Sequence, residues 1–279
     1  TDQTLWCWGK NGVGQLGDRT NSLRTTPTMV GPATDWSRLD TGGNHTCAVK
    51  AGGTLWCWGF DAYGQLGRGW LGGWTDTPTQ AGSESNWNDV SAGDNHTCAT
   101  RNDGSLWCWG YNSNGQVGDF TTTDRTTPTR VQNWDADGGE RWTNVSAGAG
   151  HTCARRVEGT LWCWGDPYYG QTGTGSTGSC CTSFTQVGSS TMWTSVTTGW
   201  RHTCATKTNN TLGGGGDNSM GQFGDGTTLG TGSPWQVSSG LTYDGGVSAG
   251  KQHTCAVKTN GTLWCWGEGG AGQLGDGRS

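Results

Sequence analysis

The sequence predicts an all-β fold built from repeats of about fifty residues, as in a β-propeller or a β-solenoid. Three observations support this prediction. Three residue strings recur in one phase along the chain, short apolar stretches alternate with glycine-rich turns, and no segment shows the periodicity of an amphipathic helix.

The first string, Leu-Trp-Cys-Trp-Gly, recurs at intervals of 50 to 55 residues, and one due copy reads Leu-Gly-Gly-Gly-Gly instead. The second string is His-Thr-Cys-Ala. The third is Gly-Gln-hydrophobic-Gly or a close variant, and its copies occur at 14–17, 64–67, 115–118, 170–173, 221–224 and 272–275. The first string starts at Leu5, Leu55, Leu106, Leu161 and Leu263, its altered copy at Leu212, and the second string at His45, His96, His151, His202 and His253.

Composition excludes several classes of protein. The 279 residues include 53 glycines but only 6 prolines, without the three-residue period of collagen. The 19 tryptophans argue against disorder. A net charge of −5 without basic runs disfavours nucleic-acid binding. No apolar stretch is long enough to span a membrane.

The segment 47–57 predicts a hairpin that turns about Gly52. In this register Cys47 faces Cys57, and Val49 faces Leu55 on the same side of the strands. Ala48 faces Trp56 on the other side. We expect the tryptophans of these strings, together with Trp36, Trp87, Trp142 and Trp193, to lie in the core.

Cysteines ten residues apart recur in this register, and directly opposed residues of an antiparallel pair lie within disulfide reach. We therefore predict four disulfide bonds, each stabilising the fold by about 2.7 kcal/mol in the chain-entropy picture. Reduced core cysteines are the alternative, and the spacing does not fit a zinc knuckle. The predicted pairs are Cys47–Cys57, Cys98–Cys108, Cys153–Cys163 and Cys255–Cys265.

Four cysteines fall outside this pairing. Cys7 occupies a bridge position whose partner is expected before Thr1, and the glycines of 213–216 leave Cys204 without its mate. Cys180 and Cys181 are adjacent and lie outside the repeat. We expect this pair to clip a loop or to form an intermolecular link.

The order hydrophobic-x-x-Gly-x-x-His-Thr, Gly-x-Leu-Trp-x-Trp-Gly, Gly-Gln-Leu-Gly and Pro-x-x-Val resembles the RCC1 repeat family over essentially the whole chain. The resemblance implies a seven-bladed propeller with one four-stranded blade per repeat. Residues 1–279 would then form a single domain of about five and a half repeats, a fragment lacking about one and a half. A smaller closed propeller is the alternative.

The five histidines share one repeat position, which indicates a structural role in each blade rather than a catalytic one. No nucleophile–base arrangement is apparent, so we expect no catalytic residues, no metal and no cofactor. Four aspartates near the Gly-Gln strings are typical turn residues, with calcium binding as the alternative. They are Asp18, Asp119, Asp225 and Asp276.

Aromatic residues in non-consensus loops are the candidate binding residues. Trp70 and Trp74 lie in an inserted loop, Trp134 precedes a second insertion over 135–141, and Tyr168 and Tyr169 lie in an atypical turn. Propellers bind partners through loops at the ends of their blades, and aromatic residues are common anchors there. The alternative is that these rings pack over the blade ends.

Together these features predict a non-enzymatic binding or assembly scaffold outside the cell or at its surface. Its partner would be another protein or further copies of itself. A carbohydrate-binding propeller that uses the loop tryptophans is one alternative. A Ran-type nucleotide-exchange regulator is another, which the acidic charge and the cysteine framework disfavour.

Overall fold

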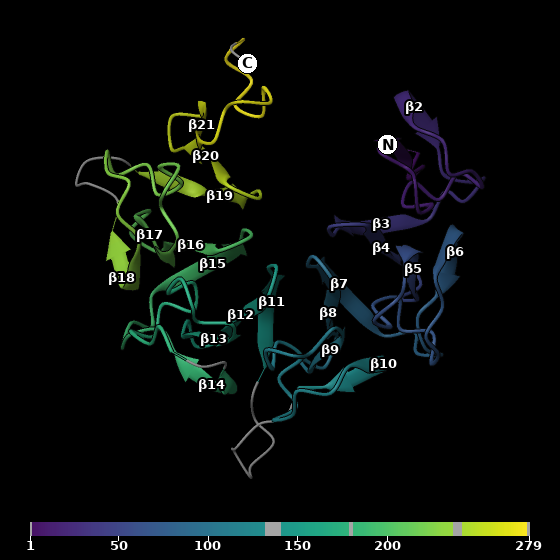
Figure 1. Cartoon of the computed structure of the whole chain (residues 1–279), viewed down its shortest axis with the longest axis horizontal. Coiled ribbons are helices and arrows are strands. Elements are labelled where there is room, and N and C mark those ends of the chain that lie inside the picture. Colours follow the sequence, from purple (N-terminus) through teal and green to yellow (C-terminus); the bar gives the residue numbers. More distant parts are fainter. Residues whose placement is uncertain (1, 132–140, 179–180, 237–241, 278–279) are drawn as a thin grey trace. The chain divides into compact units, whose positions relative to one another are not determined.

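A computed structural model describes residues 2–131, 141–178, 181–236 and 242–277. These residues form strands joined by loops, and none of them forms a helix (Figure 1). No membrane-crossing helix is therefore found among them. The chain divides into two compact units. Unit 1 comprises Thr1–Ser113 and Thr121–Arg141, and unit 2 comprises Asn114–Phe120 and Trp142–Ser279.

Unit 1 contains three antiparallel sheets whose strands follow the chain order. The first holds two strands, β1 (Trp6–Gly9) and β2 (Arg24–Met29). The second holds β3 (Trp36–Thr41), β4 (His45–Lys50), β5 (Leu55–Phe60) and β6 (Trp74–Gln80). The third holds β7 (Trp87–Ala92), β8 (His96–Arg101), β9 (Leu106–Gly110) and β10 (Arg125–Arg130).

Unit 2 repeats the same plan. Its first sheet holds β11 (Trp142–Ala147), β12 (His151–Arg156), β13 (Leu161–Gly165) and β14 (Cys181–Gln186). Its second holds β15 (Trp193–Thr198), β16 (His202–Lys207), β17 (Leu212–Gly216) and β18 (Thr231–Gln236). Its third holds β19 (Tyr243–Ala249), β20 (His253–Lys258) and β21 (Leu263–Gly267).

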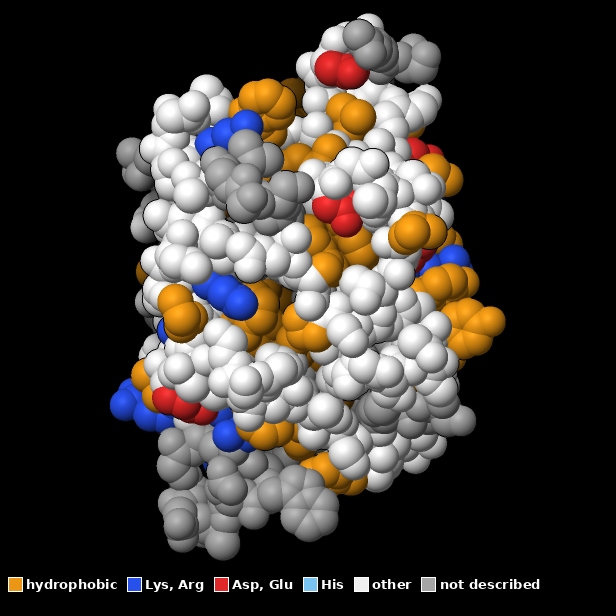
Figure 2. All heavy atoms as spheres, turned by 90° about the vertical axis from the view of Figure 1, so that its left-hand side faces the viewer, with side chains coloured by type: hydrophobic (Ala, Val, Ile, Leu, Met, Phe, Trp, Pro, Cys, Tyr) orange, Lys and Arg blue, Asp and Glu red, His pale blue; other side chains and the backbone are white. Residues whose placement is uncertain are grey.

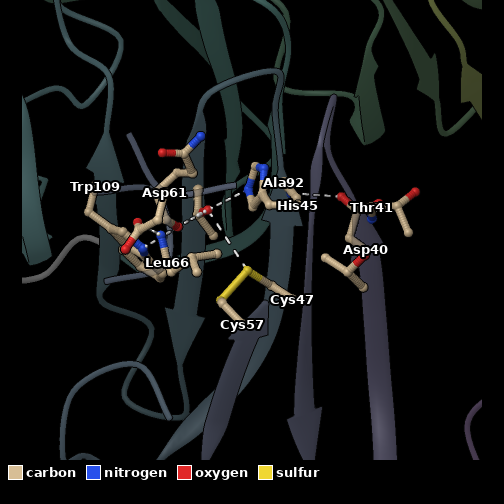
Figure 3. The surroundings of a disulfide bond; sticks show 12 residues. Asp40, Thr41, His45, Cys47, Cys57, Asp61, Leu66, Ala92 and Trp109 are labelled. Carbon is tan, nitrogen blue, oxygen red and sulfur yellow. Dashed lines mark hydrogen bonds between the residues drawn. A yellow bond between two sulfur atoms is a disulfide. The ribbon is translucent and has the colours of Figure 1, made fainter. Parts of the chain in front are cut away.

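The predicted hairpin register is confirmed. In the β4–β5 pair Cys47 faces Cys57, Ala48 faces Trp56, and Val49 faces Leu55. Each predicted bridge is present, with 4.1 Å between the Cα atoms of its two cysteines. The sulfur atoms of Cys47 and Cys57 are buried beside His45 and near Trp109 of the next sheet (Figure 3).

The tryptophans of the Leu-Trp-Cys-Trp-Gly strings divide by position. In the complete sheets the second tryptophan is fully buried, and the first is half-buried. The expectation that all of them are core residues is wrong at the terminal sheets, where Trp6, Trp8 and Trp264 are about half exposed. The reason is pairing: among the described strands, β1 is hydrogen-bonded only to β2, and β21 only to β20.

The altered string still forms a strand, β17, whose Gly214 faces the buried thiol residue Cys204. In four other repeats a loop glycine packs against the second tryptophan, as Gly17 does against Trp58. The corresponding Gly173 meets no indole, and it lies close to Gly215 instead. The loop has therefore closed over the place of the missing ring.

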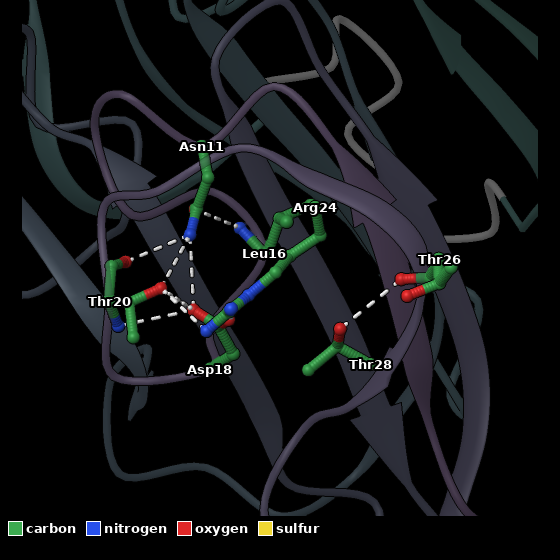
Figure 4. Close-up of polar contacts among 7 residues, drawn as sticks. All are labelled: Asn11, Leu16, Asp18, Thr20, Arg24, Thr26 and Thr28. Carbon is green, nitrogen blue, oxygen red and sulfur yellow. Dashed lines mark hydrogen bonds and ion pairs between the residues drawn. The ribbon is translucent and has the colours of Figure 1, made fainter.

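Four of the six Gly-Gln loops begin with a buried Asn or Asp side chain: Asn11, Asp61, Asn112 and Asn218. In the first loop the Asn11 amide nitrogen donates to Asp18 and to the Thr20 carbonyl, and its oxygen accepts from the Leu16 amide (Figure 4). Arg24 forms an ion pair with Asp18 at 2.6 Å. Asp18, weighed above as a calcium ligand, is thus an anchor of its own loop.

Candidate interaction surface

Strand order decides which loops share one end of a sheet. The loop between the first and second strands and the loop between the third and fourth strands lie at the same end, because neighbouring strands are antiparallel. The turn between the second and third strands lies at the opposite end. In unit 2 the first end carries Tyr168 and Tyr169 in the β13–β14 loop of the first sheet. It carries Trp200 and Arg201 in the β15–β16 loop of the second sheet, and Lys251 in the β19–β20 loop of the third.

Five of these side chains form what we call the Trp200 cluster: Tyr168, Tyr169, Trp200, Arg201 and Lys251. The Arg201 guanidinium lies 4.3 Å from the ring centres of both Trp200 and Tyr169. The Lys251 ammonium lies 5.1 Å from the Trp200 ring, and the two tyrosine rings are 5.0 Å apart. Cation–π contacts of this kind hold aromatic and basic groups together at a surface.

Backbone hydrogen bonds fix the loops that carry the cluster. The Trp200 amide donates to the Lys251 carbonyl, and the Asp217 amide donates to the Arg201 carbonyl. The Tyr169 amide donates to the Gln171 side chain at 2.7 Å. Tyr168 stays 67% exposed despite this support. The cluster therefore presents a preorganised aromatic and cationic surface, which suits a protein partner.

Unit 1 carries the second group of predicted residues. Trp70 and Trp74 are each about half exposed, and Leu71 beside them is exposed as well. The Arg68 guanidinium lies 5.2 Å from the Trp70 ring and pairs with the buried Asp61 at 2.6 Å. Burial raises the pKa of Asp61, although the Leu66 amide and Arg68 stabilise its charged form. Trp70 lies in the loop as predicted, whereas Trp74 is the first residue of β6 and pairs with Phe60. The binding role of both residues stays a prediction.

Three further residues were predicted from the sequence: Trp134, Cys180 and Cys181. Trp134 and Cys180 fall outside the described residues. Cys181 begins β14, and its side chain is not described. Their expected roles stay predictions.

Trp200 and Arg201 were not among the predicted binding residues, although the sequence carries a signal for them. The other copies place small, polar or basic residues before His-Thr, as in Gly93-Asp94-Asn95, whereas this copy reads Gly199-Trp200-Arg201. Such a departure within a repeat marks a residue that the fold itself does not require.

The histidines have the structural role that the repeat predicts. Three of them reach a threonine of the next repeat, with His Nε2 to Thr Oγ1 distances of 2.9 to 3.0 Å. Burial lowers the pKa of His45 and of His202 to about 4, and that of His96 to about 3. No three metal-binding side chains lie together in the described part of the chain. The pairs are His45–Thr97, His151–Thr203 and His202–Thr254.

Repeated antiparallel sheets of this topology define the class of β-propeller repeat proteins. The chain belongs to the RCC1-like domain family, whose profile matches residues 1–279.

Two Arabidopsis thaliana proteins are relatives of this chain. The ultraviolet-B receptor UVR8 is 37% identical over 194 residues, which cover 68% of this chain and 43% of the receptor. The mitochondrial RCC1 domain-containing protein RUG3 is 29% identical over 196 residues, with 67% and 43% covered. This chain thus spans less than half the length of either relative.

Two solved structures share the fold. Human WBSCR16 has a TM-score of 0.81 at 20% identity, with 95% of this chain and 73% of that chain covered. Prp20p from Saccharomyces cerevisiae has a TM-score of 0.81 at 22% identity, with 100% and 70% covered. At these identities the likeness shows the propeller fold alone.

Proposed function

We propose that this chain is a non-catalytic protein-binding scaffold that works outside the cell or at its surface. The Trp200 cluster is the observation that carries the proposal. It brings together two aromatic side chains, two cations and an exposed tyrosine from the loop ends of three successive sheets of unit 2. Aromatic residues and arginine dominate the binding energy of protein interfaces.

Two further observations support the proposal. Four buried disulfide bonds favour an oxidising compartment. The charged side chains on the face in Figure 2 are few and scattered among hydrophobic and neutral ones, which does not resemble the basic surface of a nucleic-acid-binding protein. Binding to proteins also has a precedent in the fold, since the Prp20p structure concerns binding to Gsp1p and histones.

A photo-reactive amino acid in place of Tyr168 tests the proposal on native material. We expect it to capture one defined polypeptide, and we expect Trp200→Ala to reduce that capture strongly. The same group in place of Val157 is a matched control, because Val157 is 57% exposed in the turn at the opposite end of the same sheet. Equal capture at both positions, or none at Tyr168, would contradict the proposal.

Ultraviolet-B reception is a second candidate, raised by the name of the relative with 37% identity. The observation in its favour is the position of Trp200, an ultraviolet-absorbing indole between two cations at 4.3 and 5.1 Å. Illumination followed by size-exclusion chromatography and near-ultraviolet circular dichroism tests it. A change in wild type that Trp200→Phe abolishes would favour this function, and identical spectra and elution before and after light would exclude it.

A further inference from the structure

A small cavity lies between the first two sheets of unit 1, and we call it the Arg19 pocket. Its volume is about 180 Å³, and four rings contribute to its walls: Trp36, Trp56, Pro32 and Pro78. Arg19 and Lys50 also line it. The Arg19 pocket shares no residue with the Trp200 cluster or with the loop that carries Trp70.

The chain contains a filled copy of this site. Arg19 corresponds to Phe120, because each lies two residues after the last glycine of its Gly-Gln string. Pro78 corresponds to Phe184, because each precedes by one residue the threonine that lies opposite a bridge cysteine. In unit 2 the Phe120 and Phe184 rings are 5.4 Å apart, and Phe184 packs edge-on against Trp164 at 4.9 Å. An aromatic ring therefore fits the space that the Arg19 pocket leaves open.

The backbone at this position makes Arg19 unusual. Arg19 and Phe120 have φ angles of 63° and 62°, in the left-handed region that disfavours side chains. The other four repeats place glycine there: Gly69, Gly175, Gly226 and Gly277. Phe120 gains ring packing in return for this strain. The described residues provide no hydrogen bond or ion pair for the Arg19 guanidinium, which is exposed.

Two residues that line the Arg19 pocket, Trp36 and Lys50, carry donor groups that are buried or already engaged. The Trp36 indole Nε1 is buried and has no acceptor among the described residues. The Lys50 ammonium is already engaged, since it lies 4.9 Å from the Trp36 ring and 3.1 Å from Asp35. A ligand would therefore meet one free cation, Arg19, beside an apolar space.

We propose that the Arg19 pocket binds the C-terminal aromatic residue of a partner polypeptide. A cavity of about 150 Å³ accommodates benzene, so this one holds a single ring rather than a drug-sized molecule. The ring takes the place that Phe120 and Phe184 fill in unit 2. The terminal carboxylate accepts from the Arg19 guanidinium, while the ring lies against Trp36 and Trp56. The residues of this site are separate from the loops that are proposed above to bind a partner, so the two proposals can be tested separately.

The test is a titration of the isotope-labelled full chain, followed at the Trp36 indole N–H resonance. The probes are N-acetyl-phenylalanine, its uncharged C-terminal amide, and N-acetyl-alanine. We expect the acid to shift the Trp36 resonance, the amide to bind about tenfold more weakly, and N-acetyl-alanine to have no effect. A peptide that ends in phenylalanine should bind as the acid does, and the same peptide extended by two glycines should not.

Two variants make the outcome specific. Arg19→Phe copies the filled site of unit 2, so it should abolish binding of both the acid and the amide. Arg19→Gly introduces the residue of four other repeats, so it should fold normally and bind acid and amide equally. The proposal is overturned if Arg19→Phe binds the acid like wild type, if N-acetyl-alanine competes, or if the free acid binds but the phenylalanine-ended peptide does not.

Discussion

The Nε2 atom of His45 lies 2.9 Å from the Oγ1 atom of Thr97, across the boundary between two neighbouring sheets of unit 1. The Thr97 hydroxyl donates its hydrogen to the Gln65 carbonyl at 2.8 Å, so it accepts a hydrogen from His45. This assigns the Nε2–H tautomer to His45. His45 and Thr97 belong to the His-Thr strings of two successive repeats, and Gln65 belongs to the Gly-Gln loop between them. These hydrogen bonds explain why the two strings recur together.

Thr97→Val and Thr203→Val should both destabilise the protein, and to different extents. Each removes a buried hydroxyl that serves a histidine and a glutamine carbonyl, at a cost of about 1 to 3 kcal/mol. The Gln65 carbonyl keeps the Trp109 indole as a second donor at 2.9 Å. In the altered repeat Gly215 occupies the position of this tryptophan, so the Gln171 carbonyl has no indole donor. Thr203→Val should therefore lower the free energy of unfolding more than Thr97→Val does.

Urea denaturation of both variants measures this difference. Thr122→Val is a suitable control, because Thr122 is exposed in a loop of unit 1. Equal losses for Thr97→Val and Thr203→Val, or a loss in Thr122→Val as large as either, would contradict the assignment of these bonds.

Acid should weaken the fold through the buried histidines. The pKa of His45 and of His202 is lowered to about 4 by burial, against about 6.5 in an unfolded chain. Their stabilising contribution is complete above pH 6.5, and it is lost as the pH falls toward 4, because only the unfolded state takes up the protons. Each histidine should reduce the free energy of unfolding by about 1 kcal/mol per pH unit in that range.

Comparison with His45→Gln isolates this effect from the carboxylates. Burial raises the pKa of Asp40, Asp61 and Asp89, so these groups destabilise the fold as the pH rises through their pKa values. Glutamine can still donate to Thr97 but does not titrate. Denaturation curves between pH 7.5 and 4.5 should show a shallower pH dependence for His45→Gln, and parallel curves would refute the role of this histidine.

The fold was largely predictable, because the repeat supplies several independent copies of the same evidence. The ten-residue cysteine spacing defined the hairpin register and all four bridges. The exposure of Trp6 and Trp264 was missed, since it depends on which strands find partners rather than on any local pattern.

The candidate surface was predicted only in part. Tyr168 and Tyr169 stood out as non-consensus loop residues, but their contact with Arg201 joins loops about thirty residues apart in sequence. The Arg19 pocket was not predicted at all. It depends on the left-handed backbone at Arg19 and on the absence of an aromatic ring at Pro78, where the equivalent residue is Phe184. Both features become recognisable only when two repeats are compared in space.

Cys7 and Cys204, the two unpaired cysteines in the described part of the chain, should resist alkylation to different degrees. Burial raises the pKa of Cys204 to about 12, while burial and the charge of Asp18 raise that of Cys7 to about 11. Only the thiolate reacts, and one pKa unit changes its fraction tenfold. Iodoacetamide at pH 8 should therefore label Cys7 at least about tenfold faster than the fully buried Cys204 in native protein.

Mass spectrometry after timed quenching gives both rates. Both cysteines should react rapidly in denaturant without reductant. Labelling of Cys204 in native protein as fast as Cys7 would show that the Gly213–Gly216 region opens readily, contrary to the packing described.

Amine cross-linking of native, non-reduced material with mass spectrometry tests the central claim most directly. Lys251 lies in the Trp200 cluster, whereas Lys207 and Lys258 lie at the opposite ends of their sheets. The binding-scaffold proposal predicts links from Lys251 to another polypeptide, none from Lys207 or Lys258, and intact bridges including Cys153–Cys163. Free thiols at the bridge positions, or intermolecular links only from Lys207 and Lys258, would contradict it.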